Sequence, residues 1–444
     1  MLLLDVTRVD PISARAKRKW LATFSQLRTI APLRALYQTL PVGLRARVSH
    51  RNLDNAIAAS SATHFPRTPG WDRQIPKDLP VFGSRAQLGG EGINVFGFFK
   101  GQFGLAESAR LYTRALIECG VPVAVNNIEI DQPHQDGDTD FDEFLIDDAP
   151  YPTTIVFANP DHFLDPSFKK VLKKIQGTRV IGSWFWELED VPQAWLPALD
   201  MVDGLLVASR FIEAAFRKVT DKPITRVPIP LPVGRPDSGL QRNDFGLPKD
   251  KYIFLTTFDF SSSLERKNPF GTIAAFKQAF PERNDVRLLI KSSNGFRHPL
   301  ELQELINIAA EDHRIIFVDQ VVDSAHLRSL QRCCDVYVSL HRSEGFGLGI
   351  AECMLLGKPV IATGWSGNTD LTTNGASNVD YVLVPVGGRY QGGNSDRWAE
   401  PCLKDASRKM CMAVRGQLPP AALHMPQDEV IERILSAAAV VGTP

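Results

Sequence analysis

Hydrophobic residues along most of the chain alternate between short apolar runs and helical spacings. Ile93–Phe99 is a continuous apolar run, which is typical of a strand buried on both faces of a parallel sheet. After the turn at 100–104, the apolar residues between Leu105 and Leu116 recur at helical spacing, which predicts a helix. Such alternation predicts an α/β fold with a parallel sheet. Further buried strands are predicted at Val121–Val125, Thr154–Phe157, Arg179–Ile181 and Gly204–Val207.

A stretch rich in proline and glycine between Pro228 and Gly239 interrupts this alternation and predicts an interdomain linker. The alternation then resumes, which predicts a second domain of the same kind. Doubly wound sheets bind ligands beyond the carboxyl ends of their strands, so a central cleft between the two domains is the expected site. The strands predicted for the second domain are Tyr252–Thr256, Val286–Ile290, Ile315–Val318, Val336–Ser339, Pro359–Ala362 and Tyr381–Val384.

The pattern divides the chain into four predicted segments. Residues 1–90 form a basic, partly helical extension that does not follow the α/β pattern. Residues 91–235 form the first Rossmann-like domain, and residues 236–425 form the second. A C-terminal helix is predicted over residues 426–444.

The N-terminal extension has a charge of its own. Residues 1–51 contain ten Lys or Arg and two acidic residues, and apolar residues lie at helical spacing between Trp20 and Leu36. The segment fits either a helix on an anionic membrane surface, contacting it through residues 1–50, or a helix packed on the rest of the protein. The chain has no apolar run of the roughly 20 residues that a membrane span needs. Its start does not resemble a secretory signal, so we expect a cytoplasmic protein, peripheral at most on the inner face of the membrane.

The overall composition narrows the function classes. Fifty basic and fifty acidic side chains cancel, which is not the balance of a nucleic-acid-binding protein. None of the six cysteines forms a C-x-x-C pair, so a zinc site is not expected. The acidic stretch 131–148 fits a metal-binding loop or a solvated loop, and its irregular ligand spacing favours the latter. We therefore expect no bound metal.

The stretch 336–370 concentrates the candidate chemistry. A buried strand leads into the loop HRSEGFG and then into a helix that ends at Gly357. A glycine-rich turn before a helix N-terminus exposes backbone N–H groups and a positive dipole end, which suits a diphosphate. Glu344 and Glu352 flank this turn and are eight residues apart. Their carboxylates suit two separate hydroxyl-bearing groups, although acidic residues also stabilise ordinary helix N-termini.

The segment SEGFGLGIAECMLLGKPVIAT resembles the signature of the retaining glycosyltransferase family 4, and the resemblance covers about residues 93–425. It implies a GT-B fold whose first domain faces the acceptor and whose second domain binds a nucleotide sugar. It also implies that Glu344 contacts the donor sugar and that Glu352 binds the ribose hydroxyls. No metal or other cofactor is implied. The residues expected to line the sugar and the phosphates are Gly345, Phe346, Gly347 and Leu348.

Two further segments fit the same family. Lys267 matches a lysine that neutralises the diphosphate leaving group. The family's usual arginine is replaced by Ser261, and Arg266 is the substitute that we expect. A solvated turn that caps a helix is the alternative for this segment. In the first domain the glycine loop after the first strand is expected to face the donor, although a tight turn would also favour glycine. This loop comprises Gly101, Gln102, Phe103 and Gly104.

The segment GSWFWELEDVP lies near the position at which many members of the family carry a histidine of the catalytic site. Trp184, Trp186 and Glu187 stand there instead. Tryptophans at this density also fit a buried core, and Glu187 is the residue that we expect to line the site. Asp161 and His162 are weaker candidates.

The expected function is the transfer of a sugar from a nucleotide-diphosphate donor to a glycan or lipid-linked acceptor in polysaccharide or glycoconjugate synthesis. The motifs resemble those of bacterial mannosyltransferases of surface polysaccharides, which favours GDP-mannose. One alternative is another enzyme of GT-B architecture, such as a sugar-nucleotide epimerase or a glycan phosphorylase. The other is a sugar-binding module without catalysis.

Overall fold

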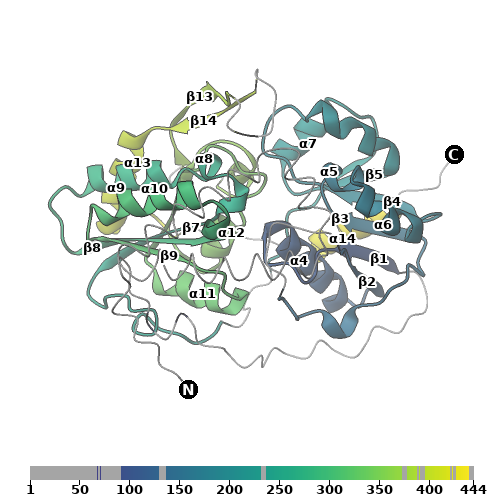
Figure 1. Cartoon of the computed structure of the whole chain (residues 1–444), viewed down its shortest axis with the longest axis horizontal. Helices are drawn as coiled ribbons and strands as arrows, with labels where there is room; N and C mark the ends of the chain where they lie inside the picture. The colour runs from purple at the N-terminus through teal and green to yellow at the C-terminus, as the bar shows by residue number, and fades with distance from the viewer. Residues whose placement is uncertain are drawn as a thin grey trace.

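The computed structural model describes residues 68, 71, 92–129, 137–231, 237–372, 378–387, 390, 396–420, 423 and 427–439. In this part of the chain two α/β domains lie side by side, as Figure 1 shows. Each has a six-stranded parallel sheet. The protein therefore has the expected fold class, two Rossmann-like domains arranged as in GT-B proteins.

The first domain contains the sheet with strand order β2-β1-β3-β4-β5-β6. Strands β1, β3 and β5 are buried along their whole length, as the apolar runs predict. Helical segments lie between successive parallel strands, which cannot be joined by tight turns. The strands are β1 (Ile93–Gly97), β2 (Val123–Asn127), β3 (Thr153–Phe157), β4 (Arg179–Ser183), β5 (Gly204–Val207) and β6 (Ile224–Arg226). The helices are α4 (Gly104–Glu118), α5 (Pro160–Phe163), α6 (Lys169–Lys174) and α7 (Arg210–Arg217).

The second domain contains the sheet with strand order β12-β11-β10-β7-β8-β9. Its strands are β7 (Tyr252–Asp259), β8 (Val286–Ser293), β9 (Ile315–Asp319), β10 (Val336–Ser339), β11 (Val360–Thr363) and β12 (Asn378–Val379). Its helices are α8 (Leu264–Lys267), α9 (Pro269–Ala279), α10 (Pro299–Ala310), α11 (Ser324–Cys333), α12 (Leu348–Leu355) and α13 (Leu403–Val414).

One predicted strand lies outside the main sheets. The sequence pattern predicts that Tyr381–Val384 extends the second parallel sheet, but this run forms β13 (Tyr381–Pro385), which pairs antiparallel with β14 (Arg397–Pro401). Its apolar residues are not covered on both faces, since the Val382 side chain is 64% exposed. A short apolar run does not reveal the sheet to which it belongs.

The chain returns to the first domain at its C-terminal end. Helix α14 (Gln427–Ala439) packs against α4, β5 and β6, and in Figure 1 it lies among the strands of the first domain. Val430, Ile431 and Ile434 are buried there. Arg179 Nη1 on β4 donates to the carbonyl oxygen of Ala438 at 3.1 Å. The helix thus completes the first domain with residues from the opposite end of the sequence.

Two described residues of the N-terminal stretch pack on the second domain. Trp71 is buried against Phe245, with ring centroids 5.0 Å apart, and its Nε1 donates to the Phe245 carbonyl oxygen at 2.9 Å. Thr68 Oγ1 donates to the carbonyl oxygen of Asp244 at 2.6 Å. The basic segment 1–51 and the helix expected around Trp20 lie outside the described residues. In the portion that is described, no helix combines the length and the apolar character that crossing a membrane requires.

Candidate active site

Both domains line one cavity of about 1200 Å³. The first domain contributes the turn after β1, including Gln102 and Gly104, and the segment after β4, including Glu187. The second domain contributes the segments that follow β7 and β10. These segments all follow the carboxyl ends of parallel strands, which is where open α/β sheets bind ligands.

The N-terminus of α12 opens into this cavity. Gly347 precedes the helix with φ +92°, a left-handed conformation that glycine adopts without strain, and no side chain caps the first turn. Leu348 and Gly349 line the cavity. The helix also sits very close to the sheet, since a Cβ at Gly349 would lie 2.4 Å from Tyr337 Oη. Uncapped N–H groups and the positive end of the helix dipole therefore face the cavity and suit an anion.

Glu344 lies in the loop before α12, between two cations. Its side chain forms ion pairs with Lys267 and with Arg266, whose Nη1 is 3.3 Å from Glu344 Oε2. The residue is only 9% exposed. Burial alone would raise the pKa of this carboxyl, but Lys267 and Arg266 more than offset it and lower the pKa of Glu344 to about 2. Glu344 is therefore ionised at neutral pH.

Lys267 is placed by the backbone around it. It ends the short helix α8, and Asn268 after it has φ +50°, which turns the chain directly into α9. The Asn268 side chain caps α9 by accepting from Gly271 N at 3.1 Å, and it donates to the Leu340 carbonyl oxygen at 2.9 Å. Burial lowers the pKa of the Lys267 ammonium, and Glu344 opposes this shift only in part. The turn thus fixes Lys267 beside the loop that carries Glu344.

Arg266 is buried in a dense set of contacts. Its Nη1 donates to the Ser343 carbonyl oxygen at 2.8 Å, and its Nη2 lies 3.6 Å from Glu187 Oε1. Its guanidinium also lies over the ring of Tyr390, 5.6 Å from the centroid. Burial would lower the pKa of Arg266, but Glu187, Tyr390 and Glu344 outweigh it and raise the pKa above its usual value. Arg266 therefore links the Glu344 loop to the first domain, with its donors largely engaged by protein groups.

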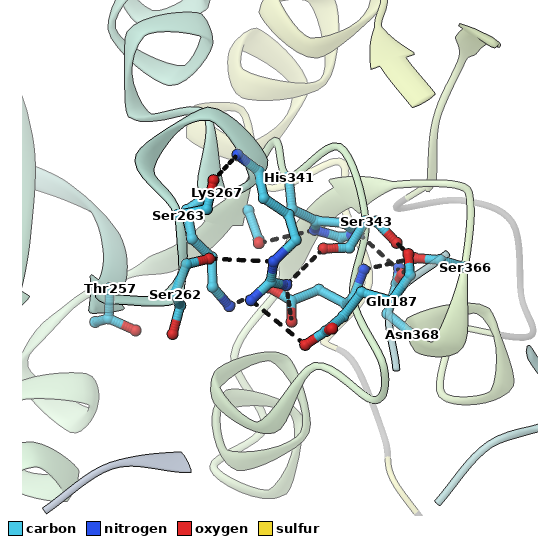
Figure 2. Close-up of polar contacts among 12 residues, drawn as sticks. Glu187, Thr257, Ser262, Ser263, Lys267, His341, Ser343, Ser366 and Asn368 are labelled. Carbon is cyan, nitrogen blue, oxygen red and sulfur yellow. Dashed lines mark hydrogen bonds and ion pairs between the residues drawn. The ribbon is translucent and has the colours of Figure 1, made fainter. Parts of the chain in front are cut away.

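Glu187 is the first-domain residue of this cluster. Besides Arg266, its carboxylate accepts from Tyr390 Oη at 2.9 Å, and its carbonyl oxygen accepts from Ser343 Oγ. Figure 2 shows Glu187 close to Ser343 of the second domain. Trp186 lines the cavity and packs on Tyr390. Trp184 is buried in the first-domain core against Phe163 and Phe216, and it does not line the cavity.

His341 belongs to a network that the sequence did not reveal. Its Nε2 faces Asn368 Oδ1 at 2.9 Å, and Ser339 Oγ faces its Nδ1 at 2.9 Å. Asn368 Nδ2 donates to the Thr363 carbonyl oxygen, which orients the amide, so Nε2 carries the proton and Nδ1 accepts. Burial lowers the pKa of His341, which keeps the ring neutral. Its place three residues before Glu344, at the end of a predicted strand, was the signal available in the sequence.

Loop 366–368 supports the backbone of Glu344. Ser366 Oγ accepts from Glu344 N at 2.8 Å, and Gly367 N donates to the Glu344 carbonyl oxygen at 2.8 Å. In Figure 2, Ser366 and Asn368 lie together at the right of the cluster. A Cβ at Gly367 would lie 1.9 Å from the Gly345 carbonyl oxygen. Only glycine allows this close approach of the two loops.

Glu352 lines the same cavity from a different position. It lies four residues beyond Leu348 on α12, which is about 6 Å along a helix axis. Its Oε2 accepts from Gln331 Nε2 of α11 at 2.7 Å. The structure thus places the two glutamates at separate points of one cavity.

The remaining predicted residues divide between cavity and scaffold. Gln102, Phe103, Gly104, Asp161 and His162 line the cavity, as do Gly345, Phe346, Gly347 and Leu348. Gly101 is not among the lining residues, and its carbonyl oxygen accepts from Arg110 Nη1 at 2.7 Å. Gly101 therefore belongs to the turn behind the cavity wall.

In the described part of the acidic stretch, two carboxylates pair with arginines and Asp147 pairs with Lys174. Asp138 lies 3.7 Å from Arg110, and Asp140 lies 3.6 Å from Arg114. Residues 131–136 lie outside the described residues. Among the residues that are described, no group of three or more His, Cys, Asp or Glu side chains could hold a metal ion.

The two domains also touch beside the cavity. Ser209, which caps α7 of the first domain, donates through Oγ to the Gly345 carbonyl oxygen at 2.6 Å. Arg210 N donates to Asp370 Oδ2 at 2.8 Å. The loop before α12 is therefore held from both domains.

Comparisons with known proteins agree with this architecture. Residues 256–400 match the family described as glycosyl transferases group 1. The structure of Anabaena HepE in complex with UDP and glucose is 12% identical, with a TM-score of 0.50, and the match covers 79% of this chain and 100% of that chain. The sucrose-phosphate synthase of Thermosynechococcus elongatus is 15% identical, with a TM-score of 0.50, and covers 79% of this chain and 95% of that chain.

The pneumococcal O-GlcNAc transferase GtfA in complex with UDP and GlcNAc is 18% identical, with a TM-score of 0.43; the match covers 64% of this chain and 56% of that chain. A comparison with curated protein sequences gives no match. At 12% and 15% identity, the structures of HepE and of the sucrose-phosphate synthase show the fold alone. The sequence match falls on the second domain, which carries Lys267 and Glu344. The family match and the two-domain fold together support a glycosyltransferase.

Proposed function

We propose that the protein transfers a glycosyl group from a nucleoside-diphosphate sugar to a glycan or lipid-linked acceptor, with retention of the anomeric configuration. One observation carries this proposal. Lys267, Glu344 and the uncapped N-terminus of α12 meet at the wall of a cavity that both domains line. This arrangement offers a cation and backbone donors to a diphosphate and a carboxylate to the sugar beside it.

The chemistry asks the protein to stabilise a leaving group. The bond between the anomeric carbon and the β-phosphate oxygen breaks, and the acceptor oxygen bonds to the same carbon. The acceptor's proton passes to the departing phosphate on the same face of the sugar. Negative charge that develops on the nucleoside diphosphate is stabilised by the Lys267 ammonium and the α12 N–H groups. Glu344 orients the sugar by accepting from its hydroxyl groups.

The first domain faces this centre with candidates for the acceptor side. Gln102, Asp161 and His162 line the cavity. The rings of His162 and Phe98 pack together, with their centroids 5.1 Å apart. Glu187 joins the domain to Arg266. We propose that Glu187 and Arg266 hold the Glu344 loop in place over the donor, and that the acceptor enters between these first-domain groups and the sugar.

We propose GDP-mannose as the donor, because the motifs around Lys267 and Glu344 resemble those of bacterial mannosyltransferases. The structure of HepE contains UDP and glucose, so UDP-glucose is the second donor that we compare with GDP-mannose. The acceptor in this proposal belongs to polysaccharide or glycoconjugate synthesis.

Thermal unfolding in the presence of GDP-mannose, UDP-glucose and ADP-glucose tests donor binding directly. We expect one of the three to raise the melting temperature, since a ligand that binds only the folded state stabilises it. Slow release of the nucleoside diphosphate should accompany binding, and a suitable acceptor should accelerate it. The anomeric configuration of the product, measured by NMR, tests retention.

Lys267→Ala should lose most of the donor-induced shift and of the turnover, and Glu352→Ala should chiefly weaken nucleotide binding. Lys277→Ala is the matched control. Lys277 pairs with Glu311, which follows α10, and it does not line the cavity. A nucleotide shift that is the same in Lys267→Ala and in the control would contradict the proposed site. Binding of all three donors without transfer or hydrolysis would point to a sugar-binding module instead.

A further inference from the structure

Lys291 is a cation on the wall of the cavity that no sequence motif marks. It lies near the carboxyl end of β8, lines the cavity and is 7% exposed. Within the described part of the chain, its ammonium group makes no hydrogen bond and no ion pair. Among the described residues, its nitrogen is not one of the fully buried polar atoms that lack a partner, so its donors open into the cavity and can reach a ligand there.

The sheet register places Lys291 on the floor beneath α12. Thr257 on β7 is the parallel register partner of Lys291, so both side chains leave the same face of the sheet. Thr257 Oγ1 lies 2.9 Å from Tyr337 Oη of β10. Both hydroxyls lie under Gly349 of α12, where a Cβ would be 2.4 Å from Tyr337 Oη and 3.3 Å from Thr257 Oγ1. Lys291 therefore continues this row on the face that α12 covers.

Three carboxylates act on the charge of Lys291, and none of them bonds to it. Asp259 already accepts from Asn294 Nδ2 at 2.8 Å, and Asp319 accepts from Ser292 Oγ at 2.7 Å. Glu352 accepts from Gln331. Burial lowers the pKa of Lys291, and Asp319, Asp259 and Glu352 oppose this shift. Their field favours the charged form of Lys291 while its three donor positions remain available in the cavity.

The geometry points to Lys291 as a further donor-binding residue, which holds the ribose of the nucleotide together with Glu352. This inference rests on the proposed function. A diphosphate at the α12 N-terminus leaves its ribose beside the next turn, and Glu352 lies there, about 6 Å along the helix. A hydroxyl group both donates and accepts, so a carboxylate can accept from a ribose diol while an ammonium donates to it. The Lys291 ammonium donates a hydrogen bond to a ribose hydroxyl oxygen.

A comparison of ribo- and deoxynucleotides tests this pairing. The affinity of the full-length protein for UDP and GDP is measured beside that for their 2′-deoxy and 3′-deoxy counterparts. In the unaltered protein, one of the two deletions should weaken binding about tenfold or more, the cost of losing a hydrogen bond to a charged group. In Lys291→Met, ribonucleotide binding should weaken by a similar factor, and the penalty for the same deoxynucleotide should largely disappear.

The ratio between ribo- and deoxynucleotide is measured within each variant, so a general loss of stability does not change its interpretation. Lys277→Met is the matched control and should keep the full penalty. Glu352→Gln should reduce the penalty as Lys291→Met does. A penalty that persists unchanged in Lys291→Met would overturn the ribose role of Lys291 and leave the proposed function standing. Absence of any nucleotide binding by the unaltered protein would instead overturn the proposed function, and this inference with it.

Discussion

The carboxylate of Glu344 lies buried between Lys267 and Arg266, and this setting determines how the folded protein responds to acid. Its pKa falls from 4.5 to about 2. Between these pH values the unfolded chain binds a proton that the folded chain does not. Stability from this group is therefore complete above about pH 4.5 and is lost as the pH falls towards 2.

Glu344→Gln should remove this contribution. At neutral pH we expect the free energy of unfolding to fall by about 3 kcal/mol, because two buried cations lose their carboxylate. The difference from the unaltered protein should shrink steadily between pH 4.5 and 2. Urea unfolding of both proteins across this range is the measurement. Stability curves that stay parallel down to pH 2 would show that Glu344 does not depend on these two cations.

Much of the Glu344 neighbourhood could be predicted from the sequence, because its parts lie in contiguous motifs. Glu344, the glycines after it and Lys267 carry local patterns that indicate their chemistry, and the structure brings Lys267 and Glu344 together. His341 and Lys291 carry no such pattern. Their settings arise from strand register and from loops far along the chain, such as Asn368 opposite His341. A single sequence does not reveal such pairings.

The turn between α8 and α9 shows how one residue orients an element of the site. Asn268 adopts φ +50°, caps α9 through Gly271 N and donates to the Leu340 carbonyl oxygen of the loop after β10. This single side chain ties the segment that carries Lys267 to the segment that carries Glu344. The site therefore depends on a residue that does not itself need to touch a ligand.

Substitutions at Asn268 should separate its roles. Asn268→Ala should destabilise the protein by about 2–3 kcal/mol, since it loses a helix cap and a buried hydrogen bond and strains a left-handed backbone. Asn268→Gly removes the strain and should cost less, whereas Asn268→Asp keeps the cap and loses only the donation to Leu340. Chemical unfolding and nucleotide titration of the three variants are the measurements. Equal stability of the Ala and Gly variants would argue against backbone strain at this turn.

Strands and helices of the two main sheets were predictable from periodicity, and the exceptions have physical causes. The continuous runs at β1, β3 and β5 are buried on both faces, so their apolar character is unambiguous. The run at β13 is equally apolar but pairs with β14 outside the main sheet. The pairing depends on residues 397–401, and the run itself carries no sign of it.

The first domain is held together by a helix from the far end of the chain. α14 buries Ile434 completely, while the adjacent Leu435 is 38% exposed. Helix α14 contacts α4, β5 and β6, which belong to residues 104–226. Stability of the domain that comes first in sequence therefore depends on residues 427–439.

Ile434→Ala should lower the free energy of unfolding by about 2–4 kcal/mol, because it leaves a cavity between α14 and the sheet. Leu435→Ala is the matched control on the same helix and should change stability by about 0.5 kcal/mol or less. Thermal unfolding of both variants is the measurement. If both substitutions lowered stability equally, the packing of α14 on the first domain would not be the source of the effect.

Trp71 and α14 each pack on the domain that is more distant from them in the sequence. Trp71 packs on the second domain, and α14 packs on the first. During translation, residues 92–231 leave the ribosome well before residues 427–439. The first sheet therefore lacks the helix that covers one of its surfaces, whereas Trp71 is already available to pack on the second domain. The half of the protein that is translated earlier is thus completed last, and nascent chains halted before residue 427 lack the helix that finishes it.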